Sequence, residues 1–174
     1  MVIVGIVALL LLLAIIYTEI YTAKARVVPA PSRPIMRTTM LEQLPLDLTG
    51  VIYDLGSGWG GLALRAARRC EQANVVGIEL SPLPYWCSRL FIKHPRVSFR
   101  RGNFLEQPLA EASALICYLN FDIMREIGEK LITTLPKGCL IISATFPIPN
   151  LEPILVVHTK GLMVEAPVYV YKKG

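Results

Sequence analysis

The residues of this chain best placed to do chemistry lie in a short stretch, residues 53–61 (YDLGSGWGG). It holds an acid, Asp54, and glycines at Gly56, Gly58 and Gly60. β-Branched apolar residues precede it and helix-forming residues follow it, which predicts a strand, a turn and a helix. In a parallel α/β sheet a ligand binds at the carboxyl end of such a strand. Glycines there permit positive φ and let a ligand approach the backbone, although an ordinary tight turn is the alternative.

A second acid favours the ligand interpretation. Residues 74–79 (NVVGIE) predict another short apolar strand, which ends in Glu79 and is followed by Leu80. A carboxylate at the end of the second strand can accept hydrogen bonds from both ribose hydroxyls of an adenosine group. The two segments together therefore predict a nucleoside-containing cofactor.

The pattern Asp54-x-Gly56-x-Gly58-x-Gly60 with a strand-terminal Glu79 resembles the first two motifs of the class I (seven-β-strand) S-adenosylmethionine-dependent methyltransferases. Dinucleotide enzymes space their glycines as G-x-G-x-x-G, so the spacing here argues against NAD. The resemblance implies S-adenosyl-L-methionine as the cofactor. It assigns cofactor binding to Asp54, Gly56, Ser57, Gly58, Gly60, Glu79, Leu80, Asn103 and Phe104.

The same resemblance implies the fold, an α/β three-layer Rossmann-like sandwich. Its sheet would be mostly parallel and seven-stranded, with an antiparallel last strand. Asn103 and Phe104 follow the third expected strand, at positions that contact adenine in the family. A plain loop asparagine is the alternative for Asn103.

The acceptor side of the site is expected where the fourth and fifth strands end. Methyl transfer from a sulfonium needs alignment and exclusion of water, and no nucleophilic side chain or metal. The segments after residues 114–119 and 139–145 would deliver Tyr118, Asn120, Phe121 and Phe146. Asn120 could accept a hydrogen bond from an amine, and the aromatic rings could line a channel. The alternative is that Tyr118 and Phe121 belong to the core and Asn120 caps a turn.

Neither histidine and none of the four cysteines indicates a metal site. His94 and His158 lack companions at ligand spacing, and the cysteines form no C-x-x-C pair. We therefore expect no bound metal. The cysteines are expected to be small buried hydrophobic residues.

The N-terminal segment is predicted to be a membrane anchor. Residues 1–18 carry no charge, and a helix of about 20 apolar residues spans a bilayer. Lys24, Arg26, Arg33 and Arg37 follow it, which places the rest of the chain on the cytoplasmic side. A cleaved signal peptide and a buried core helix are the alternatives. The expected organisation is an anchor (residues 1–22), a basic proline-rich linker (residues 23–37) and a methyltransferase domain (residues 38–174).

Two further helices are expected, one before the first strand and one after the fourth. Residues 38–44 hold helix-forming residues that begin at Thr38 and end before Pro45. Residues 123–135 carry apolar side chains at an i, i+4 spacing, which predicts a regular helix to Leu135.

The organisation into anchor, linker and domain resembles that of the membrane-anchored protein-lysine methyltransferases that act on ATP synthase subunit c and the adenine nucleotide translocase, with their prokaryotic relatives. The resemblance implies lysine N-methylation of a membrane protein at the cytoplasmic face. Two alternatives stay open: methylation of a lipid-soluble small molecule or phospholipid headgroup, and a non-catalytic cofactor-binding scaffold. The net charge is +5, but no arginine-rich run with interleaved aromatics supports a nucleic-acid partner.

Overall fold

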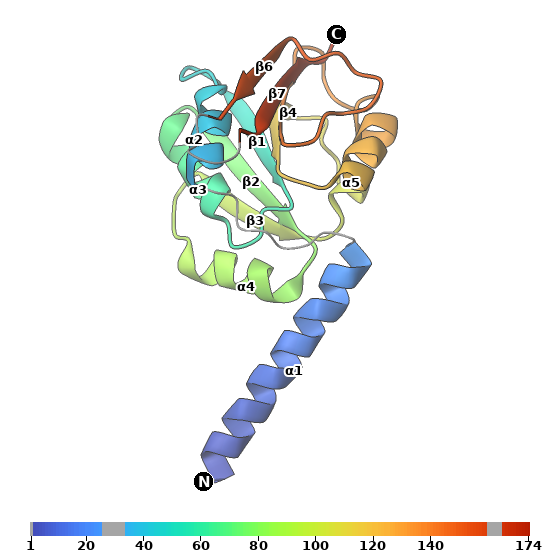
Figure 1. Cartoon of the computed structure of the whole chain (residues 1–174). Coiled ribbons are helices and arrows are strands. Elements are labelled where there is room, and N and C mark those ends of the chain that lie inside the picture. Colours follow the sequence, from blue (N-terminus) through green and yellow to red (C-terminus); the bar gives the residue numbers. More distant parts are fainter. Residues whose placement is uncertain (1, 26–33, 160–164) are drawn as a thin grey trace.

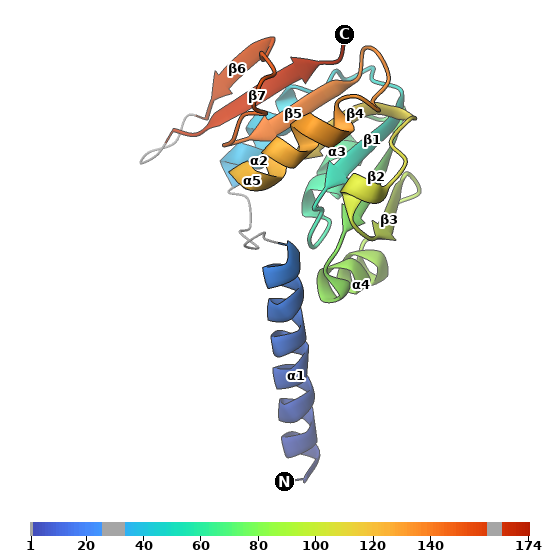
Figure 2. The same ribbon diagram turned by 90° about the vertical axis from the view of Figure 1, so that its right-hand side faces the viewer.

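A computed structural model of the chain describes residues 2–25, 34–159 and 165–174. Within these ranges the chain forms a seven-stranded sheet with the order β3-β2-β1-β4-β5-β7-β6 (Figures 1 and 2). The strands are β1 (Gly50–Leu55), β2 (Ala73–Glu79), β3 (Val97–Arg101), β4 (Ala112–Cys117), β5 (Leu140–Ala144), β6 (Leu155–His158) and β7 (Pro167–Lys172).

The strand directions confirm the Rossmann-like part of the predicted fold. β1 pairs in parallel with β2 and β4, and the outer pairs β2–β3 and β4–β5 are parallel too. β7 is antiparallel to both β5 and β6, between which it is inserted. The order reverses at β1 and β4, so their carboxyl ends form the switch point where ligands bind in open α/β sheets.

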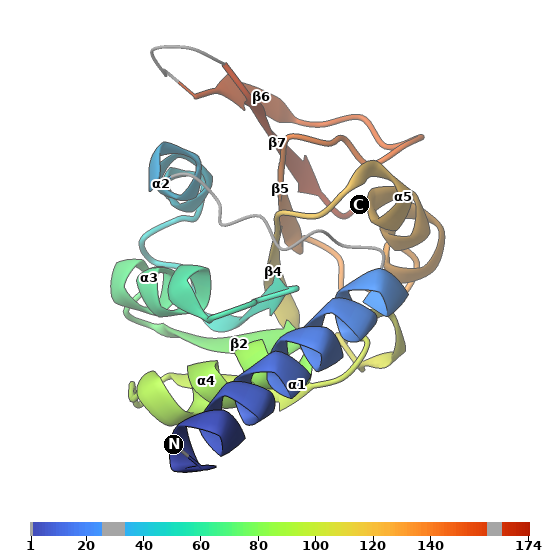
Figure 3. The same cartoon turned by 60° about the horizontal axis from the view of Figure 1, so that its bottom comes forward.

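Both faces of the sheet are buried, which explains the nearly continuous apolar runs of the central strands. Successive residues of a strand point to opposite faces. Ile52 accordingly packs with helices α2 (Pro34–Glu42) and α3 (Gly61–Arg69), and Tyr53 packs with α5 (Phe121–Glu126) on the other face. Figure 3 shows α3 and α5 on opposite sides of the sheet. Helix α4 (Pro82–Phe91) packs against β2 and β3.

Two connections differ from simple crossover helices. A single 3₁₀ turn, η1 (Phe104–Glu106), lies between β3 and β4. After β4, α5 continues as a π-helical turn, η2 (Ile127–Leu131), rather than as the regular helix to Leu135 that the apolar spacing predicts. The segment that follows β5 reaches this turn, because a Cβ on Gly128 would lie 2.9 Å from Ile148 Cγ2.

The predicted membrane anchor is wrong. Among the residues that the structure describes, no helix is long and apolar enough to cross a membrane. The apolar run does form a helix, α1 (Val2–Ala25), whose described apolar side chains are well exposed, with Ile3 at 78%. The prediction rested on the apolar character and length of the run and on the positive charges that follow it. These sequence features do not reveal contacts between elements, and α1 contacts α4. The expected single-pass location with a cytoplasmic-side domain is corrected with it.

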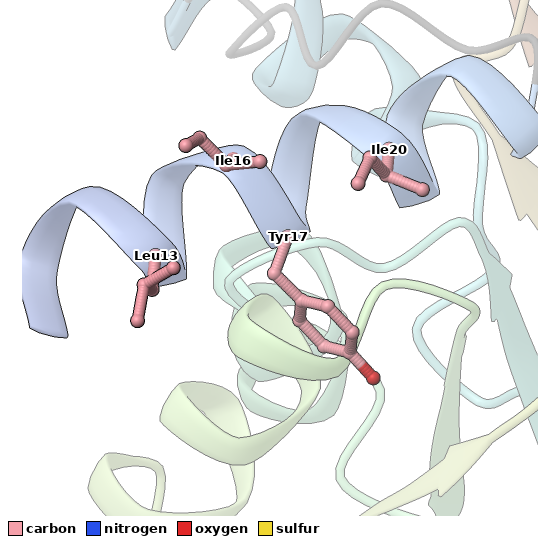
Figure 4. Close-up of a pocket in the computed structure, with 4 residues that line it drawn as sticks. All are labelled: Leu13, Ile16, Tyr17 and Ile20. Atoms are coloured by element: carbon pink, nitrogen blue, oxygen red, sulfur yellow. The ribbon is translucent and has the colours of Figure 1, made fainter.

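The face of α1 near α4 carries a shallow apolar hollow. Leu13, Ile16, Tyr17 and Ile20 line it, and Figure 4 shows the Tyr17 ring directed toward the neighbouring helix. None of the predicted site residues takes part in it. The expected linker falls mainly at residues 26–33, outside the described residues, and α2 begins at Pro34 rather than at Thr38.

The four cysteines are free thiols. Cys70, Cys117 and Cys139 are buried, whereas Cys87 on α4 is half-buried. Burial raises the pKa of Cys117 to about 12 and that of Cys139 to about 11. These two thiols therefore stay protonated at neutral pH.

Candidate active site

The glycine turn between β1 and α3 is built as the sequence predicts. Gly56, Gly58 and Gly60 have φ values of 73°, 53° and 78°, a region that L side chains rarely adopt. A Cβ on Gly60 would lie 2.5 Å from Phe99 Cζ, so this glycine serves close packing. Nothing lies within 4 Å of a Cβ placed on Gly58, which therefore borders open space.

Glu79 fixes this turn to the end of β2. Its side chain is only 8% exposed, and its two oxygens accept hydrogen bonds from the backbone N–H groups of Gly58 and Ser81, each at 2.7 Å. The N–H groups of Gly56 and Ser57 also donate to the Ile78 carbonyl. A carboxylate offers about four lone-pair sites, so Glu79 keeps acceptor capacity for ligand hydroxyls.

Asp54, the last but one residue of β1, is the most perturbed acid of the site. It is 2% exposed, and desolvation raises its pKa from 3.8 to about 7, with a smaller contribution in the same direction from the charge of Glu79. The Ala63 backbone N–H donates to the carboxylate and opposes this shift. The Oδ2 atom is buried without a hydrogen-bond partner, as is the nearby turn hydroxyl of Ser57. Buried polar atoms without partners are costly, and a bound cation would satisfy Oδ2.

The expected adenine side lies against the same edge of the sheet. The Gly102 N–H donates to the Glu79 carbonyl, which brings the end of β3 to the end of β2. Asn103 uses its Oδ1 to accept from the Leu105 N–H and its Nδ2 to donate to Glu106 Oε1. Its amide therefore caps η1, and Phe104 is buried in the core cluster that includes α5. Leu80 is half-buried beside Glu79.

On the acceptor side the structure brings the end of β4 to the glycine turn. A Cβ on Gly56 would lie 2.9 Å from Leu119 Cδ2. Asn120, the next residue, is the N-cap of α5, with its Oδ1 accepting from the Ile123 N–H at 3.0 Å. Tyr118 is half-buried against the α2–α3 side of the sheet, and Phe121 is 49% exposed. The cap accounts for Asn120 structurally, and its predicted contact with an amine stays a prediction.

Phe146 follows an unusual turn at the end of β5. Thr145 has φ 71°, and the Phe146 N–H donates to the Ala144 carbonyl at 2.8 Å, which closes a three-residue turn. The Ser143 hydroxyl donates to the Phe146 carbonyl, and the Thr145 N–H donates to the Pro167 carbonyl. Sequence reasoning missed this turn, since a β-branched residue gives no signal for positive φ.

Over the described part of the chain, no group of three histidine, cysteine, aspartate or glutamate side chains is arranged to hold a metal ion. Arg37, which belongs to α2 and lies next to the start of α3, is a further candidate that its sequence position did not indicate. Its Nη1 lies 3.5 Å from the position that a Cβ on Gly61 would occupy.

A mostly parallel seven-stranded sheet, a glycine turn after β1 and a buried acid at the end of β2 define a class I S-adenosylmethionine-dependent methyltransferase. The chain is an enzyme of this class. Comparison with known families gives the narrower assignment: the chain belongs to the ANTKMT methyltransferase domain family, whose model matches residues 54–155.

Individual relatives agree with this class. A protein-lysine N-methyltransferase of Saccharolobus islandicus is 27% identical over 88% of this chain and 97% of its own length. The adenine nucleotide translocase lysine N-methyltransferase of mouse is 30% identical over 62% of this chain, which spans about half (48%) of that protein. An RNA methyltransferase from Salinibacter ruber, solved with S-adenosyl-L-homocysteine, superposes with a TM-score of 0.73 at 32% identity, covering 84% of this chain and 94% of that one.

The residues present fit S-adenosylmethionine. Its methionine moiety carries an ammonium group, which suits the unpartnered buried Oδ2 of Asp54. The open space beside Gly58 allows a ligand to approach the backbone, and Glu79 can accept from ribose hydroxyls. When bound, the cofactor supplies a methyl group already activated by the positive charge on sulfur.

Proposed function

We propose that the protein transfers methyl groups to the ε-amino group of lysine residues in a protein acceptor. The observation that carries this proposal is the match to the Saccharolobus islandicus protein-lysine N-methyltransferase over 97% of that protein's length. The similarity therefore extends over nearly the whole length of that enzyme. The mouse relative, named for a protein acceptor, supports the same acceptor class.

The chemistry of a lysine acceptor suits the acceptor side described above. An ordinary lysine has a pKa near 10.4 and must lose its proton before its nitrogen can accept a methyl group. Burial of an amine among apolar and aromatic groups lowers its pKa. Leu119, which follows β4, contacts the position of a Cβ on Gly56, and this brings that end of the sheet to the glycine turn. Tyr118, Phe121 and Phe146 follow β4 and β5 and are our candidates for such an apolar surrounding.

The connections on this side of the sheet are short, which favours an acceptor that brings its own structure. After β4, α5 begins at Phe121, and after β5 the chain turns at Thr145 toward β6. No additional domain is inserted between the described strands to enclose a small molecule. RNA is the second candidate acceptor, because the Salinibacter ruber neighbour has RNA methyltransferase in its description.

The test uses the purified protein, tritiated S-adenosylmethionine and extract from cells that lack the enzyme. The labelled extract is separated into protein, RNA and organic-soluble fractions, and labelled protein is digested for mass spectrometry. We expect label in a discrete protein band that maps to methylated lysine. Label in RNA supports the second candidate, and label in the organic fraction supports a small-molecule or lipid acceptor; either result overturns the lysine proposal.

A matched pair of variants controls this experiment. Glu79→Gln alters the acid that holds the glycine turn, and we expect it to abolish most labelling. Glu111→Gln changes an exposed acid just before β4, at the end of that strand opposite the glycine turn, and is expected to label as the wild type does. Loss of label in both variants would mean that the signal depends on fold integrity rather than on the site.

A further inference from the structure

Arg37 is a half-buried cation on α2 whose guanidinium group is only partly satisfied by the fold. Its Nε is buried without a hydrogen-bond partner. Its Nη1 lies 3.5 Å from the position of a Cβ on Gly61, the first residue of α3. The guanidinium group is therefore next to the glycine turn, although it comes from a separate element of the chain.

Helix α2 is held firmly in this place. Met36, Met40 and Leu41 are buried in the core cluster on the α3 side of the sheet. Arg69, at the end of α3, donates from Nε to the Leu44 carbonyl and from Nη2 to the Glu42 carbonyl. These contacts fix the backbone beneath Arg37, so its placement beside Gly61 follows from the packing of α2 on α3.

A buried guanidinium N–H without a partner, such as Arg37 Nε, costs free energy, and a bound anion would remove that cost. The two acids of the site, Asp54 and Glu79, suit the ammonium and hydroxyl groups of the cofactor but leave its carboxylate without a counterpart. A guanidinium group matches a carboxylate through two parallel hydrogen bonds. The adjoining N-terminus of α3 favours a negative charge at the same place.

We propose that Arg37 binds the carboxylate of the methionine moiety of S-adenosylmethionine. The inference depends on the cofactor alone and is independent of the acceptor. The proposal also gives α2 a function. Residues 53–61 contain no cationic side chain, and α2 places one next to them.

The test compares two ligands by isothermal titration calorimetry. S-Adenosylhomocysteine carries the amino-acid end, whereas 5′-methylthioadenosine keeps the adenosine and the thioether and lacks that end. We expect Arg37→Gln to weaken S-adenosylhomocysteine binding by about 10-fold to 100-fold, the range of a charge-assisted contact. Binding of 5′-methylthioadenosine should change by less than about twofold. Arg65→Gln, on the exposed side of α3, should change neither affinity.

Equal weakening for both ligands would show that Arg37 supports the fold of the site. No weakening for either ligand would show that Arg37 does not reach the cofactor. Either result overturns the proposal. If Arg37→Gln does not fold, Arg37→Lys takes its place, and we again expect loss for S-adenosylhomocysteine alone. Wild-type protein adds a measurement without mutation, since decarboxylated S-adenosylmethionine should bind more weakly than S-adenosylmethionine. Equal binding of that pair overturns the proposal as well.

Discussion

Asp54 makes the site sensitive to pH, because burial raises the pKa of its carboxyl group. The side chain therefore stays protonated at pH values where an exposed aspartate is ionised. Burial raises the pKa of Asp54 from 3.8 in the unfolded chain to about 7 in the folded protein. Between these two values the folded protein binds a proton that the unfolded chain has released. The contribution of Asp54 to the unfolding free energy therefore falls as pH rises from 3.8 to about 7, and the stability that its protonated side chain contributes is lost above that range.

The first prediction concerns Asp54→Asn, which stays neutral at every pH. In the ligand-free protein we expect the variant to gain stability relative to wild type between pH 5 and pH 8, measured by urea unfolding. An ammonium group at Oδ2 favours the ionised carboxylate, so wild-type affinity for S-adenosylhomocysteine should rise about tenfold from pH 6 to pH 8. The affinity of the variant should be flat over this range, and a parallel rise in both proteins would contradict the assignment.

The second prediction separates two glycines of the same turn. Gly60→Ala should destabilise the protein by about 2–4 kcal/mol, because strain at positive φ adds to overpacking against Phe99. Gly58→Ala should cost only about 1–2 kcal/mol from strain, since its Cβ would meet open space. We nevertheless expect Gly58→Ala to weaken S-adenosylhomocysteine binding at least about tenfold, because that space faces the ligand. Thermal unfolding and calorimetry check the pair, and wild-type affinity in Gly58→Ala would place the cofactor elsewhere.

Sequence reasoning predicted the backbone geometry of the glycine turn well, because that geometry is local, whereas the ligand contacts of its residues stay a prediction. An acid, three spaced glycines and a second acid at a strand end require one arrangement, and the structure has it. The roles of Asn103 and Asn120 were harder to predict. Each caps the turn or helix that follows it, and an amide side chain can cap or bind a ligand with the same atoms. Arg37 was missed because its significance depends on packing between distant parts of the chain.

At the level of the elements, the turn after β5 combines a strained backbone with a position on the proposed acceptor side of the site. Three hydrogen bonds fix Thr145 and Phe146, and a fourth joins the Ile148 N–H to the Tyr171 hydroxyl oxygen. Threonine at positive φ is unfavourable, and such strain persists only where surrounding contacts impose it. After this turn, the chain that carries Phe146 no longer continues in the direction of β5.

The third prediction uses glycine to relieve this strain. Thr145→Gly should leave the unfolding free energy unchanged or raise it by up to about 1 kcal/mol. It should lower kcat/KM for the acceptor by about tenfold through looser placement of Phe146, with cofactor affinity unchanged. Asn150→Gly is the matched control, because Asn150 is an exposed residue at φ 61° and its change should affect neither quantity. Unaltered acceptor kinetics in Thr145→Gly would show that the strained turn has no part in the reaction.

The elements themselves were predictable to different degrees, for physical reasons. The central strands were clear because burial on both faces demands continuous apolar runs. The segment after β4 was predicted to be a regular helix, whereas it contains a π-helical turn. Apolar spacing does not reveal that the segment after β5 packs closely against Gly128 in this turn. The start of α2 was misplaced because proline was interpreted as a breaker, although Pro34 occupies the first helical position, where proline is tolerated.

For the whole molecule, the two core clusters draw their described residues from Met36 onward. Helix α1 contacts α4, and none of its described side chains belongs to either cluster. The expected boundary between an N-terminal segment and a methyltransferase domain therefore stays a prediction that can be tested directly.

The fourth prediction is that a protein starting at Pro34 folds and binds S-adenosylhomocysteine within about threefold of the full chain, since both core clusters remain complete. Circular dichroism, thermal unfolding and calorimetry measure this. A Leu41→Ala change in the shortened protein serves as a destabilised reference, expected to lose about 2–4 kcal/mol because it removes a buried side chain. Loss of folding on removal of α1 alone would mean that the methyltransferase unit extends to the N-terminus.

The distribution of the cysteines has a practical consequence for spectroscopy. Three thiols are buried, and the raised pKa values of Cys117 and Cys139 keep both in the unreactive protonated form. Cys87 is half-buried on α4, the helix that begins directly after the Ser81 N–H bound by Glu79. A maleimide fluorophore should therefore attach at one position of the unmodified chain, on a helix joined to the proposed ribose contact. The wild-type protein thus offers a single labelling site from which ligand binding can be followed in real time.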